Sequence, residues 1–424
     1  MTMIYALILF AVTYVLMLTF TKYRPYIALG SAVVFIATGM LPFDQIFGAI
    51  DWNVLLMIAG TMGLVQLFID SRMPARLADM IMLKVPNVQM VAVALALFAG
   101  IISAFVDNVA TVLMVAPVAL AICKKLKTNP VPFIIGIAVS SNLQGAATLV
   151  GDTTAIMLGS YADMSFLDFF WYKGRPGIFF AVELGAIASA LILAWLFRRE
   201  KDSIEQRGEL TPVTDYVPTV LLVGMIALLI SASFIPVKPD ITNGLICVSL
   251  FIIGMVYTFA RTRSADAFLG PIKSIDFETI GLLFGLFLVI GGITNMGVVD
   301  AAAGLLARMG GGNVFVIYTV IVWASVLFSA FIDNIPYVAT MLPVVTGLAS
   351  TLGIDPTLLY FGLLSGATLG GNCTPIGASA NITGIGILRR EGYEVKTGDF
   401  CRIGIPFTLA AVIPAYIYFW LLYA

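Results

Sequence analysis

The sequence predicts an all-α polytopic membrane protein made of two inverted repeats, each with a re-entrant helical hairpin and a broken helix. Three observations support this. Hydrophobic residues occupy 60% of the 424 positions and charged residues only 11%, with a mean hydropathy of +1.02. Apolar runs of about 20 residues, long enough to cross a bilayer as helices, recur along the chain. Finally, the same series of runs and motifs occurs twice.

The apolar runs form two matching series on either side of a polar segment. Residues 1–200 and 216–424 are the two predicted repeats, and 201–215 is the linker between them. The expected helical runs are 4–20, 26–42, 52–70, 87–106, 109–123, 131–160 and 176–197, then 217–236, 241–260, 277–297, 314–332, 335–350, 356–388 and 403–423. The first run has no basic residue before it and no small-residue cleavage site after it, so a retained span is expected.

Three pairs of motifs repeat at an offset of 225 to 226 positions. "SAFVDNVATVLMVAP" from Ser103 returns as "SAFIDNIPYVATMLP" from Ser329. "LQGAATLVGD" from Leu143 matches "LGGNCTPIGA" from Leu369, and "IDWNVLLMIAGTMG" resembles "IDFETIGLLFGLFL". A constant offset across separate motifs indicates an internal duplication.

Basic residues predict the orientation. If the N-terminus is outside and each hairpin enters and leaves on one side, each half crosses five times and the second half is inverted. Only Lys173, Arg175, Lys238 and Arg308 then lie outside, and the other 19 of the 23 basic residues lie in the cytoplasm. The linker is thus expected to be cytoplasmic and the protein to lie in a prokaryotic-type inner membrane. Counting each hairpin as two full spans gives the same score, so re-entrance is a separate hypothesis.

Two Asp-Asn pairs lie inside the apolar hairpin runs, at Asp107 and at Asp333. A lone carboxylate at membrane depth costs at least ~2.5 to 3.5 kcal/mol. Because every lysine and arginine was assigned to a loop, no basic side chain is left to neutralise these two, and a sodium ion or a proton is the expected partner. Asn and Asp favour helix caps, and Pro336 is expected to interrupt the second copy. Alternatively, both aspartates are structural hairpin caps.

Glycine-, threonine- and asparagine-rich stretches interrupt the next run in each half, at 140–155 and 366–381. Glycine lets a helix unwind, the freed carbonyls can hold a hard cation, and the resuming helix N-terminus can face an anion. Such backbone is tolerated at membrane depth only where it lines an enclosed or wet space. The two stretches therefore predict one central site. The alternative is close helix packing by small residues.

The candidate ion- or substrate-binding residues supply oxygens and amides from these four motifs. They are Asp107, Asn108, Thr111, Asn142, Thr148, Asp152, Asp333, Asn334, Asn372, Thr374, Ser379 and Asn381. Possible sodium ligands among them are Asp107, Asn108, Asp333, Asn334, Asn372 and Thr374. Glu183, in the last run of the first half, is either a structural hydrogen-bonding group or a proton site.

Other function classes find no support in the sequence. There is no histidine, the four cysteines have no metal spacing, and no nucleophile is placed with a base, so no catalytic residue is proposed. No P-loop is present, so an ion gradient is expected to supply the energy. A net charge of -1 argues against a nucleic-acid partner. No cofactor is expected apart from Na⁺ or H⁺ as a coupling ion.

The duplicated Asp-Asn hairpins, "GGNCTPIGASAN" and the "GD" at Gly151 resemble the ion transporter superfamily over nearly the whole chain. The resemblance is to its arsenite permease and sodium/proton antiporter branch (ArsB/NhaD), which includes P protein-like members and is related to the divalent anion:sodium symporters. It implies an elevator-type transporter, commonly a homodimer. Its transport domain would comprise hairpins 87–124 and 314–350 and broken helices 131–160 and 356–388, with the remainder as scaffold.

The sequence departs from the family patterns at several positions. Related dicarboxylate symporters carry Ser-Asn-Thr at the hairpin tips, where this chain has Asp-Asn-Val from Asp107 and Asp-Asn-Ile from Asp333. In the first half, Gln144 replaces a glycine, and Ala146 and Ala155 replace the asparagines matched by Asn372 and Asn381. The two pseudo-symmetric sites are therefore expected to be unequal.

Three transport functions remain open for a small inorganic or organic ion. Sodium/proton exchange is favoured by two carboxylates in the membrane without a base. Proton-coupled efflux of arsenite or another oxyacid is possible because a neutral hydroxide needs no basic ligand. Sodium-coupled import of a di- or tricarboxylate such as citrate would use helix N-termini in place of arginine.

Overall fold

The computed structural model describes residues 2–83, 85–126, 128–198 and 210–424. Seven of the described helices are long and apolar enough to cross a membrane, or up to nine spans if each of two bent helix pairs counts as one. An integral membrane protein is therefore supported. Several basic residues assigned to the cytoplasm lie outside the described residues: Lys84, Lys127, Arg199, Lys201 and Arg207.

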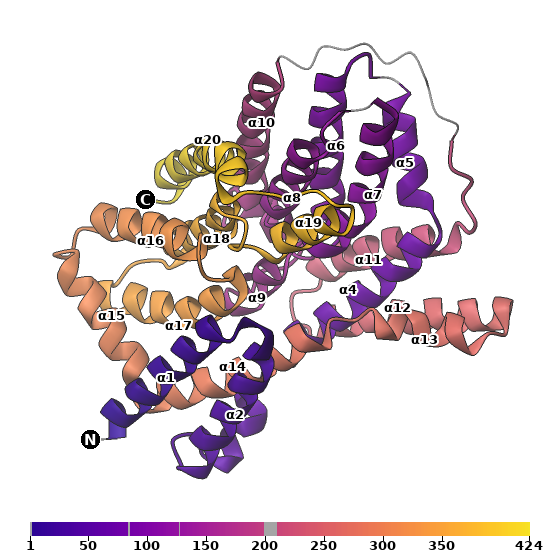
Figure 1. The fold of residues 1–424 in the computed structure, drawn as a ribbon. Helices are drawn as coiled ribbons and strands as arrows, with labels where there is room; N and C mark the ends of the chain where they lie inside the picture. The colour runs from indigo at the N-terminus through magenta and orange to yellow at the C-terminus, as the bar shows by residue number, and fades with distance from the viewer. Residues whose placement is uncertain (1, 84, 127, 199–209) are drawn as a thin grey trace.

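The helices of the two halves follow the same order (Figure 1). The first half contains α1 (Thr2–Thr19), η1 (Thr21–Tyr23), α2 (Arg24–Ala37), η2 (Phe43–Gln45), α3 (Ile46–Ala49), α4 (Trp52–Asp70), α5 (Met73–Met82), α6 (Val88–Ser103), α7 (Asn108–Leu126), α8 (Val131–Gly145), α9 (Thr153–Tyr161), η3 (Leu167–Phe169), β1 (Trp171–Tyr172), β2 (Arg175–Pro176) and α10 (Ile178–Leu196). The second contains α11 (Val217–Ser233), α12 (Thr242–Thr262), α13 (Ala265–Lys273), α14 (Phe277–Asn295), α15 (Val298–Met309), α16 (Val314–Ser329), α17 (Asn334–Leu352), α18 (Thr357–Gly370), η4 (Gly371–Cys373), α19 (Ser379–Arg390) and α20 (Thr397–Tyr423). Strands β1 and β2 pair antiparallel.

Each predicted apolar run contains a helix, but the sequence analysis missed short helices between the runs. The clearest are α5 and α15, which follow α4 and α14. Each starts after a residue with positive φ, Arg72 and Gly297 respectively. They pack against α7 and α17, so each links a long helix to the hairpin that follows it. Helices of this length are too short to span a bilayer, which is why a search for 20-residue runs passes over them.

The first group of helices interlocks the two halves. Helix α4 packs against α12, and α2 packs against α14, so each pair joins one half to the other. At the crossing points a glycine allows backbone contact. A methyl group on Gly60 would lie 2.5 Å from the carbonyl carbon of Cys247, and one on Gly285 would lie 2.7 Å from that of Ala28. We call α1, α2, α4, α11, α12 and α14 the frame.

The second group gathers the hairpins and the broken helices. Helix α6 packs on α8 and α16 on α18, while α10 and α20 pack together across the halves. Figure 1 shows α19, near the yellow end of the chain, beside the purple helices α7 and α8 of the first half. We call α6–α9 and α16–α19 the core, since they contain all twelve candidate site residues or adjoin them.

The helix breaks fall at equivalent places in the two halves, as predicted. The hairpin breaks lie between Ser103 and Asn108 and between Ser329 and Asn334. Pro336, however, does not interrupt a helix: it lies in the first turn of α17, where a missing N–H costs nothing because that group has no partner within the helix. The broken helices part at 146–152 and at 371–378, with η4 inside the second break.

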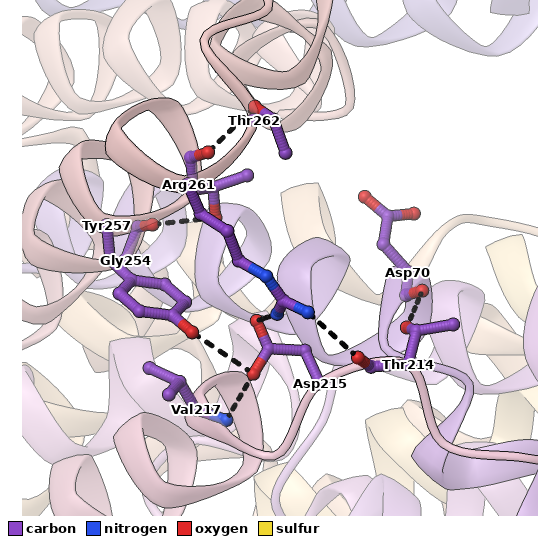
Figure 2. A network of polar contacts seen from close by, with 9 residues as sticks. Asp70, Thr214, Asp215, Val217, Gly254, Tyr257, Arg261 and Thr262 are labelled. Atoms are coloured by element: carbon purple, nitrogen blue, oxygen red, sulfur yellow. Dashed lines mark hydrogen bonds and ion pairs between the residues drawn. The ribbon is translucent and has the colours of Figure 1, made fainter.

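Residues 210–215, the part of the linker that the structure describes, are attached to the frame through Thr214 and Asp215 (Figure 2). Asp215 accepts hydrogen bonds from the hydroxyl of Tyr257 at 3.4 Å and the backbone N–H of Val217 at 3.0 Å, and it forms an ion pair with Arg261. The hydroxyl of Thr214 donates to the carbonyl of Asp70 at 3.4 Å. The start of α11 is thereby tied to the ends of α12 and α4.

Candidate functional site

A cavity of about 400 Å³ lies between the core and the frame. Both hairpin tips and both broken helices line it from the core, and α4 and the start of α14 line it from the frame. Its lining residues are Met62, Val65, Gln66, Ile69, Asp107, Asn108, Val109, Ala110, Leu113, Asp152, Thr153, Ser274, Asp276, Thr279, Asn334, Ile335 and Ser379. Among the described residues that line it, three are carboxylates and none is a lysine or arginine. We call this the acidic cavity.

A second cavity, of about 1150 Å³, lies at the opposite ends of the same two frame helices. The N-terminal part of α4 and the C-terminal part of α14 line this cavity, whereas the opposite ends of these helices line the acidic cavity. Helices α4 and α14 thus run in opposite directions between the two cavities. An antiparallel course of these two helices is what inverted repeats would give, and the inverted relation of the repeats itself stays a prediction.

The carboxylate of Asp107 caps α7 and faces the acidic cavity. It accepts hydrogen bonds from the backbone N–H groups of Val109 at 3.0 Å and Ala110 at 3.1 Å, both to one oxygen, Oδ2. Capping by aspartate is favoured because the helix N-terminus leaves N–H groups without partners. The structural role weighed as an alternative is therefore real, and it leaves Oδ1 available to a ligand in the cavity.

Asp152, in the break between α8 and α9, is buried, with 3% of its surface exposed. Its Oδ2 accepts hydrogen bonds from the Thr154 hydroxyl at 2.8 Å and from the Asn334 side chain at 3.5 Å. All of these donors are neutral, so they do not balance the charge of the carboxylate. The equivalent position in the second half is Ala378. This carboxylate therefore makes the two halves of the site chemically different.

Asp333 corrects the expectation that no basic side chain reaches these carboxylates. Nη1 of Arg24 lies 3.2 Å from its Oδ2, and the hydroxyl of Ser379 donates to the same oxygen at 3.2 Å. Its other oxygen caps α17 through the N–H of Ile335 at 3.2 Å. Arg24 was assigned to a loop because it follows the first apolar run, but it begins α2 and its long side chain extends to the second hairpin tip.

Asparagines join the two broken helices where they cross behind the cavity. The amide of Asn108 donates to Asn142 at 3.0 Å, and Asn142 donates in turn to the side-chain oxygen of Asn372 at 3.1 Å and to Thr368 O at 2.7 Å. Asn372 donates back to Val139 O at 3.0 Å. All three asparagines are buried. They therefore form a fixed polar connection between the halves, and Asn108 also lines the acidic cavity.

One threonine attaches each broken helix to its hairpin tip. The hydroxyl of Thr148 donates to the carbonyl of Ala104, and that of Thr374 donates to the carbonyl of Ala330. Thr111 is also buried and its hydroxyl lies 3.4 Å from Val106 O. These three residues hold the breaks in shape, and none of them lines the acidic cavity.

Carbonyl oxygens converge on one glycine in each break. A methyl group on Gly151 would lie 2.5 Å from Gly145 O and 2.7 Å from Ser103 O. One on Gly377 would lie 2.6 Å from Gly371 O and 2.8 Å from Ser329 O. Only glycine, which has no side chain, allows carbonyl oxygens to come this close to the backbone. Carbonyl oxygens thus crowd the break in both halves, but those of Ala104, Ala330 and Gly371 already accept hydrogen bonds from side chains. A cation held by free carbonyls at these breaks stays a prediction.

Asn381 anchors the second break from inside. Its amide donates to Gly371 O at 2.9 Å and Thr374 O at 3.0 Å, and the residue is fully buried. Within the described part of the chain its side-chain oxygen has no hydrogen-bond partner. Glu183, half-buried on α10, lines neither cavity.

The sequence analysis missed the frame side of the cavity. Gln66, Asp276 and Thr279 line it opposite the hairpin tips. Asp276 follows Ile275 in the repeated "ID" motif, and its side chain caps α14 by accepting from Thr279 N at 2.9 Å. The signal for this carboxylate in the sequence is an aspartate repeated at a helix start, Asp51 before α4 and Asp276 before α14.

Gln144 shows how one departure from the family pattern is accommodated. It packs on Gly100, where a methyl group would lie 2.8 Å from its side-chain carbon, whereas Gly370, its equivalent, packs on Val326. We expect Gly100→Ala to destabilise the protein by roughly 1–3 kcal/mol through overpacking. Adding Gln144→Ala should restore most of the loss. Thermal unfolding of the two single variants and the double variant tests this, and additive losses would contradict the contact.

Comparisons with known proteins identify the family. The chain matches the model of the CitMHS family, described as citrate transporter, over residues 14–361 and 241–424. It is 30% identical to the uncharacterized transporter MT2759 of Mycobacterium tuberculosis (strain CDC 1551 / Oshkosh) over 99% of both chains. It is 28% identical to the P protein of Homo sapiens, covering 84% of this chain and 52% of that one.

The fold also has a solved counterpart. The YdaH transporter of Alcanivorax borkumensis matches with a TM-score of 0.62 over 95% of this chain and 97% of that chain, at 14% identity, a likeness of fold alone. The P protein match agrees with the expected relatives, while the narrower arsenite permease and sodium/proton antiporter branch stays a prediction. The chain thus belongs to the CitMHS citrate transporter family and is a polytopic, mostly helical membrane transporter.

Proposed function

We propose that the protein is a secondary active transporter that binds a monovalent cation or protons at Asp107 and Asp152 and exchanges one for the other, as in sodium/proton exchange. The observation that carries this is the acidic cavity, with three carboxylates and no lysine or arginine among its described lining residues. Neighbouring carboxylates favour either a bound cation or a shared proton. Binding of one therefore displaces the other, which is the requirement for exchange.

Alternating access would carry the site between the two cavities. Helices α9 and α17 line both of them: Thr153 and Asn334 face the acidic cavity, and Tyr161 and Leu342 face the larger one. A sliding motion of the core along α4 and α14 would move the hairpin tips from one cavity toward the other. This path supports an elevator-type mechanism, in which a homodimer would hold the frame in place.

A second candidate is transport of a citrate-like carboxylate, which the family description favours. The acidic cavity constrains how such a substrate could bind, because like charges at about 4 Å repel by roughly 4 kcal/mol at an effective dielectric constant of 20. A carboxylate would then have to enter together with cations that offset both its own charge and that of the cavity. Efflux of an uncharged arsenite species would not meet this repulsion, so it remains the third candidate.

Proteoliposomes with a pH-sensitive dye inside would separate the three. Sodium, lithium, arsenite, citrate and citrate with a divalent cation are added in turn to the intact protein and to Asp107→Asn. We expect sodium or lithium alone to move protons, and we expect Asp107→Asn to abolish the signal while the asparagine still caps α7. The matched control is Asp399→Asn, because Asp399 is exposed in the first turn of α20.

Each result has a definite meaning. Proton movement driven by the alkali cation alone, lost in Asp107→Asn but kept in Asp399→Asn, supports exchange. A response that needs citrate or arsenite, with none to sodium or lithium, rejects exchange and selects the other substrate. A response that survives Asp107→Asn rejects the assignment of this carboxylate.

A further inference from the structure

The two hairpin-tip carboxylates are neutralised differently. The Arg24–Asp333 pair is largely withdrawn from solvent, with 17% and 11% of the two side chains exposed. The guanidinium is also held by the chain, because its Nε donates to Met17 O at 3.3 Å. Asp333 therefore has a fixed positive charge, a hydroxyl and a backbone N–H around it.

Asp107 has no such partner among the described residues. It shares the acidic cavity with Asp152 and Asp276, and the side chains opposite it on α4 and α14 are neutral or acidic. Within the described residues, ion pairs join Asp or Glu to Lys or Arg at four places, and Asp107 is in none of them. The first-half site therefore has to obtain its positive charge from solution.

The frame helices of the two halves also differ at equivalent positions. The contact between Ala28 on α2 and Gly285 is equivalent to the contact between Cys247 on α12 and Gly60 in the other half. Four residues before each contact, α2 carries Arg24 and α12 carries Asn243. The equivalent frame helices thus present a cation at one position and a neutral amide at the other. The residue after Asn243, Gly244, lies against Asn53 and Leu56 at the end of α4 that lines the larger cavity, whereas Asp107 lies at the other end of this helix.

We infer that Arg24 is a resident cation that fills the second-half site at Asp333, so that a single external cation binds per chain, at the first-half carboxylates Asp107 and Asp152. The inference about Arg24 rests on the proposed function, which assigns the cation site of the first half to Asp107 and Asp152. While this contact is made, the guanidinium neutralises Asp333, and this carboxylate needs no cation from solution. Removing the guanidinium should open a second cation site.

The test is Arg24→Gln in the purified full-length protein, with thermal unfolding followed during a sodium titration at constant ionic strength. For a ligand that binds the folded state, stability rises with the logarithm of its concentration in proportion to the number of sites. The rise in Tm per tenfold increase in sodium should therefore roughly double in Arg24→Gln. It should return to the wild-type slope in Arg24→Gln combined with Asp333→Asn.

Two variants serve as controls. Lys22→Gln removes an equal charge from an exposed side chain two residues away and should keep the wild-type slope. Arg24→Lys keeps the charge and should do the same. Folding of Arg24→Gln is favoured because Tyr14 still ties α1 to α17 through Pro336 O at 2.7 Å. Equilibrium binding of radioactive sodium to the wild type is an independent measurement, and one ion per chain is expected.

The outcomes separate this inference from the proposed function. A wild type that ignores sodium while Arg24→Gln responds rejects sodium exchange but supports the resident cation. An unchanged slope in Arg24→Gln, a doubled slope in Arg24→Lys, or two sodium ions bound per wild-type chain would each overturn it.

Discussion

Replacing Asp152 by asparagine is expected to lower the apparent affinity for the transported cation at least a hundredfold. A carboxylate about 4 Å from a monovalent cation contributes roughly 4 kcal/mol at an effective dielectric constant of 20, which corresponds to a factor of about a thousand. Because the side chains that donate hydrogen bonds to Asp152 are neutral, none of them competes with the transported cation for its negative charge. The measurement is the concentration of sodium that gives half-maximal proton movement in proteoliposomes.

Thr154→Val provides the comparison for Asp152. It removes the hydroxyl that donates to the carboxylate but leaves the charge in place. Its effect should be below that of Asp152→Asn, on the order of tenfold, since the lower end of the contribution of a hydrogen bond to a charged group is about 1.5 kcal/mol. If the two substitutions have equal effects, Asp152 matters for the shape of the break and not for its charge.

Gly377→Ala is expected to destabilise the protein strongly. The added carbon would lie 2.6 to 2.9 Å from the carbonyl oxygens of Gly371, Ser329 and Ala330, which are backbone atoms that cannot rotate away. Overpacking of this kind costs about 1–3 kcal/mol or more. Thermal unfolding of the purified protein should show a clear drop in Tm, and transport should fall with it.

Gly386→Ala is the matched control, because it makes the same change in α19 at a place where nothing lies within 4 Å of the new methyl group. It should leave Tm unchanged or slightly raised, since alanine favours a helix by up to ~1 kcal/mol over glycine. Equal losses in the two variants would show that the carbonyl cluster at Gly377 is not tightly packed. Gly151→Ala should repeat the result in the first half.

Local chemistry made the helix breaks predictable. Asp-Asn pairs in apolar runs are cap signals, and Gly–Thr–Asn stretches allow unwinding, so the pattern alone indicated both hairpin tips and both broken helices. The same reasoning selected Asp107, Asn108, Asp152, Asn334 and Ser379, all of which line the acidic cavity, and their role in binding stays a prediction. These residues carry their signal within a few positions of the chain.

Long-range partners were not predictable in this way. Arg24 and Asp333 are 309 positions apart, and the sequence near Arg24 looks like an ordinary loop after a membrane span. Asp276 reaches the cavity only because α14 runs antiparallel to α4 along it. Asn142 and Asn372 meet at a helix crossing, where Asn142 donates to Asn372 and Asn372 donates to Val139 O. Their role in ligand binding stays a prediction. Such contacts depend on how the two halves pack against each other. The hydrophobic periodicity of the sequence carries no information about that packing.

The interlocked frame has a consequence for synthesis. Helix α4 emerges from the ribosome early, yet the surface around Gly60 meets its partner only when α12 has been made, roughly 190 residues later. At about 5–20 residues per second this is a delay of about 10–40 s. During that interval the glycine face of α4 is in the bilayer without its partner. The newly inserted first half must therefore be shielded by lipid or by the insertion machinery until translation of α12 is complete.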